Sequence, residues 1–205
     1  EDLLFAEGEA PPPSRPRAVR VPAAFVDLAA QAVWHRDPER FARLYDLLWR
    51  LRLQPKLMED AADPAVARLH RMARAVKRDI HRLHGFVRFR EVGDRGAPRR
   101  RFAAWIEPQH RTLEPAAPFF ARRFADMDWL IATPDLCARF EDGTLRFEEG
   151  APRPELGPDD TDALWRIYFA SVFNPARANP SRMLAEMPRR WWAQMPEAAA
   201  IPDLL

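Results

Sequence analysis

The chain is poor in the residues that build several common kinds of site. Cysteine occurs once among the 205 residues, as Cys137, which excludes an internal disulfide framework and any multi-cysteine zinc or iron–sulfur site within the sequence. Only seven residues are glycine, and no glycine-rich loop of the kind that cradles phosphates is present. We therefore expect no P-loop or Rossmann nucleotide chemistry and no cofactor, and we interpret Cys137 as a small buried apolar residue.

Long apolar runs are also missing. No stretch approaches the roughly 18 apolar residues that a membrane-spanning helix needs, and no signal peptide is visible at the acidic, proline-rich start. Hydrophobic residues still make up 47% of the chain, which is enough for a sizeable core. These features predict that the protein has no membrane partner and lies in a reducing cytoplasm.

Lysine is nearly absent, because 30 of the 32 basic residues are arginine and the exceptions are Lys56 and Lys77. Arginine keeps its charge to high pH and binds phosphate through two parallel hydrogen bonds. A GC-rich genome would also raise the arginine content, so the informative feature is where the basic residues gather. Residues 66–101 hold twelve of them and three acids, a local net charge of +9 in a chain whose total is +2.

The apolar periodicity predicts an α+β fold with N-terminal helices, a small and mostly antiparallel sheet, and C-terminal helices. The expected helices span 22–35, 38–53, 63–84, 111–125 and 159–173. The expected strands span 86–90, 101–106, 129–133, 138–141 and 145–147. We expect the first two strands to form a hairpin and Asp142-Gly143 to form a tight turn. In the second helix, Phe41, Leu44, Leu48 and Leu51 recur at spacings of three and four, which is the apolar pattern of a helix.

The domain organisation follows from the proline content and from the ends of the periodic pattern. Residues 1–20 read as a proline-rich tail or linker, and residues 21–197 as a single α+β domain. Residues 198–205 read as the start of a linker to a C-terminal domain that is absent from this sequence.

The third expected helix separates its residues into faces when they are placed at 100° each. The apolar face holds Val66, Leu69, Met72, Ala73, Val76, Ile80 and Leu83. The opposite side holds Arg68, Arg71, Arg74, Arg78 and Arg82, and one flank holds His70, Lys77, His81 and His84. This pattern indicates a helix that lies along a nucleic-acid backbone. The alternative is the solvated face of an ordinary amphipathic helix.

Two further patterns offer chemistry. Glu107 and His110, just beyond an expected strand, are the candidates for a catalytic acid/base pair. The alternative is a capping Glu and a surface His at the start of a helix. His81 and His84 have the spacing of two metal ligands on a helix, but no third ligand is identified, so we expect no metal. The catalytic residues therefore stay unknown from sequence.

Basic and aromatic residues alternate again near the C-terminus. Arg177, Arg189 and Arg190 offer phosphate contacts, and Trp191 offers either a stacking surface for a base or an anchor in the core. Together with the helix and its hairpin, the expected nucleic-acid contacts are Arg71, Arg74, Lys77, Arg78, His81, Arg82, Arg88, Arg177, Arg189, Arg190 and Trp191.

Several ordered motifs resemble a known family. They are His35–Phe41, Arg78-Asp-Ile-His81, Phe86–Glu91, Trp105-Ile-Glu-Pro-Gln-His110, Phe173-Asn-Pro-Ala-Arg177, Met187-Pro-Arg-Arg-Trp191 and Met195-Pro-Glu197. Over residues 30–197 the chain resembles an uncharacterised bacterial family of proposed DNA repair or DNA metabolism proteins. The one departure is Trp191, where the family pattern has Tyr, so any role for that hydroxyl is lost.

The resemblance implies partners. Members of that family stand alone or precede a uracil-DNA-glycosylase-like domain of the UdgX type, and they accompany a radical-SAM protein assigned to DNA repair. We therefore expect a DNA-binding accessory module that positions DNA for such a domain or partner. The alternatives are an interaction scaffold for the same partners and a DNA-processing enzyme that uses Glu107 and His110.

Overall fold

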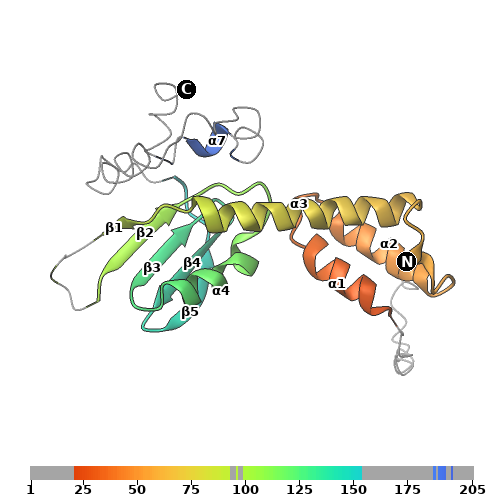
Figure 1. The fold of residues 1–205 in the computed structure, drawn as a ribbon, viewed down its shortest axis with the longest axis horizontal. Coiled ribbons are helices and arrows are strands. Elements are labelled where there is room, and N and C mark those ends of the chain that lie inside the picture. Colours follow the sequence, from red (N-terminus) through yellow and green to blue (C-terminus); the bar gives the residue numbers. More distant parts are fainter. Residues whose placement is uncertain are drawn as a thin grey trace, which may run out of the picture.

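Figure 1 shows two parts joined by one long helix in the computed structural model of the chain. The structure describes residues 21–92, 96, 99–153, 187, 189–192 and 195. The expected tail at 1–20, the expected helix at 159–173 and the segment 198–205 lie outside these residues. N-terminal helices lie at one end of the long helix and a sheet at the other, so the α+β prediction is confirmed.

The helical part consists of α1 (Ala23–Ala32), α2 (Arg40–Leu51), the short 3-10 helix η1 (Leu57–Glu59) and α3 (Pro64–Phe86). Asp63 begins α3 as predicted, because its Oδ1 accepts hydrogen bonds from the backbone N–H groups of Ala65 (2.9 Å) and Val66 (3.1 Å). The predicted apolar face of α3 is buried, with Ile80 half-buried. Its N-terminal half packs with α1 and α2 into one hydrophobic core.

The apolar pattern of α2 is confirmed as helical, but only part of it faces the core. Leu47 and Leu51 are buried and Leu44 and Leu48 are half-buried, but Phe41 is 57% exposed. The helix therefore turns its leucines toward the core and leaves an aromatic side outside. Periodicity predicts that a helix has an apolar face, but it does not choose between two such faces.

The sheet has five strands in the order β1-β2-β3-β4-β5. They are β1 (Arg90–Glu91), β2 (Arg101–Trp105), β3 (Asp128–Ala132), β4 (Leu136–Glu141) and β5 (Thr144–Glu149). All neighbours are antiparallel except β2 and β3, which are parallel because the helix α4 (Leu113–Arg123) connects them. The sheet is thus mostly antiparallel, as predicted.

Two local predictions have different outcomes. The turn between β4 and β5 is confirmed, with positive φ angles at Asp142 (48°) and Gly143 (76°). The first hairpin forms, but its strand at 86–90 is wrong, because α3 continues to Phe86 and β1 is only Arg90–Glu91. The apolar side chains of 86–89 pack against the sheet core instead of alternating across a strand.

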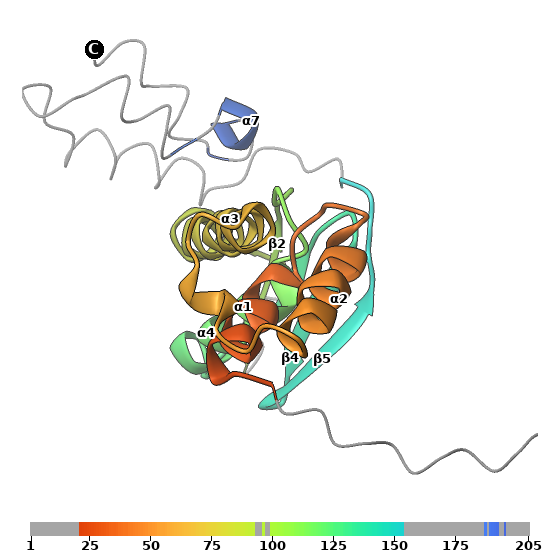
Figure 2. The ribbon, with the colours of Figure 1, turned by 90° about the vertical axis from the view of Figure 1, so that its right-hand side faces the viewer.

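A second hydrophobic core lies between α4, the end of α3 and the sheet. Phe120 of α4 packs edge-on against Trp129 of β3 (6.2 Å between ring centroids), and Trp129 stacks on Phe140 of β4 (5.4 Å). Leu83 brings α3 into this same cluster. Because α3 contributes to both cores, it fixes the helical part to the sheet part, as the two views in Figures 1 and 2 show.

Candidate nucleic-acid interface

The outward side of α3 carries the predicted basic row. Arg71, Arg74, Lys77, Arg78 and His81 are all exposed. Arg71 and Arg78 lie about 10 Å apart along the helix axis, a length over which one DNA strand carries about three phosphates. The inner side of α3 is anchored in both cores, so these cations sit on a rigid element.

These cations differ from other arginines because no carboxylate neutralises them within the part of the chain that the structure describes. Arginines elsewhere form ion pairs, as in Arg50–Asp63, Arg100–Glu91 and Arg139–Glu148. No such pair joins Arg71, Arg74, Lys77 or Arg78 to a described acid. We call these four residues the basic row. Its uncompensated charge attracts an external anion.

The ends of α3 hold cations that have other contacts. Near the start, the guanidinium of Arg68 lies 3.8 Å from Asp37, a carboxylate that also pairs with Arg43. Near the end, Arg82 and Arg88 are half-buried, and Arg88 donates to the carbonyl oxygens of Gly85 (2.8 Å) and Val87 (3.4 Å). Arg88 therefore caps the C-terminus of α3, where a cation also suits the helix dipole.

Of the C-terminal candidates, the structure describes the side chain of Trp191. Arg177 lies outside the described residues, and the structure places Arg189 and Arg190 in the short helix α7 (Arg189–Trp192) without describing their side chains. Trp191 is fully buried, donates from Nε1 to the carbonyl oxygen of Glu107 (3.1 Å) and packs edge-on against Phe86. Of the two interpretations of Trp191 from sequence, this environment corresponds to the core anchor.

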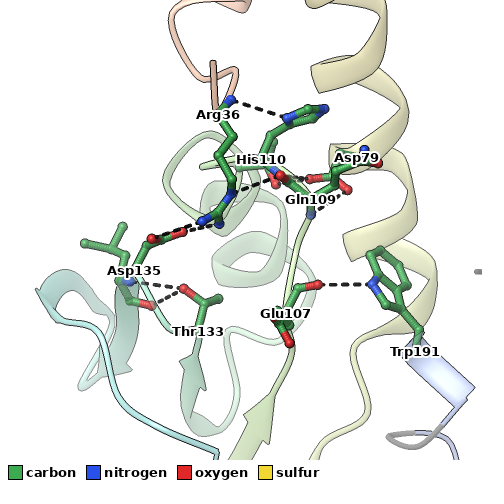
Figure 3. A network of polar contacts seen from close by, with 10 residues as sticks. Arg36, Asp79, Glu107, Gln109, His110, Thr133, Asp135 and Trp191 are labelled. Atoms are coloured by element: carbon green, nitrogen blue, oxygen red, sulfur yellow. Dashed lines mark hydrogen bonds and ion pairs between the residues drawn. The ribbon is translucent and has the colours of Figure 1, made fainter. Parts of the chain in front are cut away.

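A buried carboxylate organises the other side of α3. Asp79 is 1% exposed, and it accepts hydrogen bonds from the backbone N–H groups of Gln109 (3.2 Å) and His110 (2.9 Å) and from the hydroxyl of Thr112 (2.9 Å). Figure 3 shows the contacts of Gln109 and His110 with Asp79, which connect the loop after β2 to α3. Sequence analysis missed this role, although the helical wheel places Asp79 beside Met72 and Leu83 on the edge of the apolar face.

The same loop is connected to the N-terminal helices through Arg36. Its backbone N–H donates to Nδ1 of His110 (3.3 Å), its Nε donates to the carbonyl oxygen of Gln109 (3.0 Å), and its guanidinium pairs with Asp135. The imidazole of His110 also stacks on His35, with 4.2 Å between the ring centroids. Thus α3, the loop and the β3–β4 turn meet in one polar network.

The two acid/base candidates are not brought together. His110 is buried and its ring lies toward Arg36, whereas the side chain of Glu107 is exposed. Figure 3 shows them at opposite ends of the loop. The carbonyl oxygen of Glu107 serves instead as the acceptor for Trp191. This geometry gives His110 a structural place in the loop and leaves Glu107 in solvent.

The flanking histidines also separate. His81 is exposed, but His84 is half-buried and stacks on Phe119 of α4 with 4.1 Å between the ring centroids. Burial lowers the pKa of His84 below its usual value of 6.5, outweighing a hydrogen bond with the backbone of Ala116. Within the described residues, no three His, Cys, Asp or Glu side chains are grouped so that they could hold a metal ion.

Two further properties were expected from sequence. Cys137 is buried in β4, and burial raises the pKa of its thiol, so the side chain behaves as a small apolar group. Across the described residues, no helix combines the length and the apolar character that crossing a bilayer requires.

Comparison with known proteins adds one result. No curated protein and no solved structure matches the chain. A family model does match, over residues 38–197, which include α2, α3, the whole sheet and α7. The chain therefore belongs to the DUF4130 family, which is described as a domain of unknown function.

Proposed function

We propose that this chain is a DNA-binding accessory module of a bacterial DNA repair system. It positions DNA for a uracil-DNA-glycosylase-like domain or a radical-SAM partner enzyme, the partners that the sequence resemblance implies. The observation that carries the proposal is the basic row, in which four exposed cations of one helix have no described carboxylate partner. Each phosphate that such a row contacts releases condensed counterions, which favours binding.

The position of the row supports a role in holding DNA. Arg71, Arg74, Lys77 and Arg78 reach outward from a helix that is fixed in two cores, so they meet the phosphates without prior ordering of the backbone. Contacts to phosphates fix the orientation of a duplex or strand but do not read its sequence. Recognition of a lesion then belongs to the partner.

The competing catalytic proposal lacks this support. General acid/base catalysis needs both groups within reach of one reacting site. Glu107 and His110 face different surroundings, and the His110 ring is held by Arg36 and His35. We therefore favour a binding role over catalysis by this pair.

Direct binding of DNA tests the proposal. Labelled single-stranded, duplex and uracil-containing oligonucleotides are titrated with the protein by fluorescence anisotropy over a series of salt concentrations. We expect log affinity to fall linearly with log salt, by about 0.9 per bound phosphate for duplex and about 0.7 for single strands. Absence of binding to every probe at low salt would overturn the proposal.

A further inference from the structure

The outward side of α2 carries a row of exposed aromatic rings. Phe41, Tyr45 and Trp49 are 57%, 62% and 53% exposed, and they recur at every fourth residue. We call these three residues the aromatic row. Single exposed apolar residues are common on protein surfaces, but a contiguous group of large aromatic side chains marks an interaction site.

The rings and the neighbouring guanidinium groups form one ordered surface. Tyr45 and Trp49 lie with their ring centroids 6.2 Å apart and their planes 26° from parallel. The guanidinium carbon of Arg40 lies 4.3 Å from the centroid of Phe41, and that of Arg52 lies 4.1 Å from the centroid of Trp49. A cation thus lies against the ring at each end of the row.

These two cations are available for an anionic ligand. Arg40 donates to the carbonyl oxygens of Val33 and Asp37, and among the described residues neither it nor Arg52 pairs with an acid. By contrast, Arg43 and Arg50 on the same helix pair with Asp37 and Asp63. The aromatic row is therefore flanked by positive charge that the protein leaves uncompensated.

The row ends at a cavity. Phe41 forms one wall of a hollow of about 350 Å³, which Trp34, His110 and Arg111 also line. The volume lies within the range of small-molecule sites and is large enough for a nucleobase. The aromatic surface thus extends from Trp49 through Tyr45 and Phe41 to this hollow. Such a surface fits a polymer whose units carry flat rings.

We propose that the aromatic row of α2 is a stacking platform for the unpaired bases of single-stranded DNA. This inference rests on the proposed DNA-binding function and adds a strand preference to it. Bases stack on aromatic rings regardless of sequence, and arginines beside the rings hold the phosphates between them. The Asp37 carboxylate, which contacts Arg43 of α2 and Arg68 of α3, connects α2 to the helix that carries the basic row.

A nucleic-acid strand matches this surface better than an apolar protein segment. Here a cation that has no described acidic partner flanks the exposed rings at each end of the row, and a nucleic-acid strand supplies both a π-face and a negative charge at each nucleotide. The leucines of α2 turn inward, apart from Leu53 just beyond its end, so the outward side of the helix offers rings and charge.

The test separates stacking from apolar contact. Replacing Tyr45 and Trp49 with leucine keeps apolar surface and helix propensity but removes the π-faces, whereas replacing both with phenylalanine keeps the rings. Because stacking contributes about 1–3 kcal/mol per base, we expect Tyr45→Leu/Trp49→Leu to weaken binding of a labelled oligothymidine by roughly tenfold or more. We expect Tyr45→Phe/Trp49→Phe to keep its affinity for oligothymidine. In both variants we expect the affinity for duplex DNA, and the slope of log affinity against log salt, to stay unchanged.

The matched control changes exposed apolar residues elsewhere. Val26→Ala/Phe147→Ala alters α1 and β5, and we expect it to bind as the unchanged protein does. If the leucine pair binds oligothymidine as tightly as the unchanged protein, or if the leucine and phenylalanine pairs weaken binding equally, the platform is rejected while DNA binding through α3 stands. If the unchanged protein binds no DNA, both proposals fail and the row becomes a surface for a protein partner.

Discussion

At the scale of single residues, Asp79 connects the fold to the proposed site. Its carboxylate lies on the inner side of the helix that carries the basic row outward, and it receives three hydrogen bonds from the loop at 109–112. A buried acceptor of this kind fixes both the loop and the rotation of the helix, because its removal would leave buried donors without a partner.

Removing this carboxylate is expected to destabilise the protein. Asp79→Ala leaves two backbone N–H groups and the Thr112 hydroxyl without an acceptor, so we expect the free energy of unfolding to fall by about 2–4 kcal/mol in urea denaturation. Asp79→Asn keeps one acceptor oxygen, so we expect a decrease smaller than that of Asp79→Ala. As a control, Asp27→Ala at an exposed position of α1 stays within about 0.5 kcal/mol. If the free energy of unfolding of Asp79→Ala decreases no more than that of the control, Asp79 does not hold the loop against the helix.

The contacts that the sequence could not predict share a physical reason. Asp79 meets partners 30 to 33 residues away, and Trp191 meets Glu107 at a separation of 84 residues. Helical periodicity describes only neighbours within a few turns. The exposed cations needed no such information, because their position opposite an apolar face already placed them in solvent.

At the scale of elements, the helices were easier to predict than their faces. The sequence predicts the start of α3 at Asp63-Pro64 and the separation of its apolar and basic sides, because capping and amphipathicity depend on neighbouring residues. In α2 both the leucines and the aromatic residues recur at helical spacing, so only tertiary contacts decide which side is buried. The parallel pair β2–β3 was likewise not foreseen, because it depends on the path of α4.

The contact between α3 and α4 predicts a pH dependence. Burial lowers the pKa of His84, so this side chain binds a proton less readily in the folded protein than in the unfolded chain, where its pKa is near 6.5. The contribution of His84 to stability is therefore complete above pH 6.5 and declines as the pH falls through the folded pKa. His35, whose pKa burial also lowers, adds to the same decline.

A substitution isolates the share of His84. His84→Phe keeps a ring against Phe119 and removes a buried Nε2 that has no hydrogen-bond partner among the described residues. The free energy of unfolding of both proteins is measured by urea denaturation at pH 7.5 and at pH 5.5. We expect it to fall less for this variant than for the unchanged protein when the pH is lowered. Equal decreases in the two proteins would show that His84 does not titrate between these values.

At the scale of the whole molecule, α3 connects the helical part to the sheet part and carries the basic row. Its inner side belongs to both hydrophobic cores, and its outer side holds Arg71, Arg74, Lys77 and Arg78. A separate aromatic row lies on α2, next to it in the helical part. We propose that these two surfaces bind nucleic acid in different ways, the cationic one through phosphates and the aromatic one through bases.

The most direct test of this account is the salt dependence of DNA binding after charge reversal on α3. Arg74→Glu/Arg78→Glu is compared by fluorescence anisotropy with Arg123→Glu/Arg146→Glu, which makes the same change in net charge on α4 and β5. We predict that the first pair lowers the affinity and the slope of log affinity against log salt, by about 0.7–0.9 for each phosphate that the variant no longer binds, and that the second pair changes the slope little. An unchanged slope in the first pair, or an equal change in both, would contradict the assignment of DNA binding to the basic row.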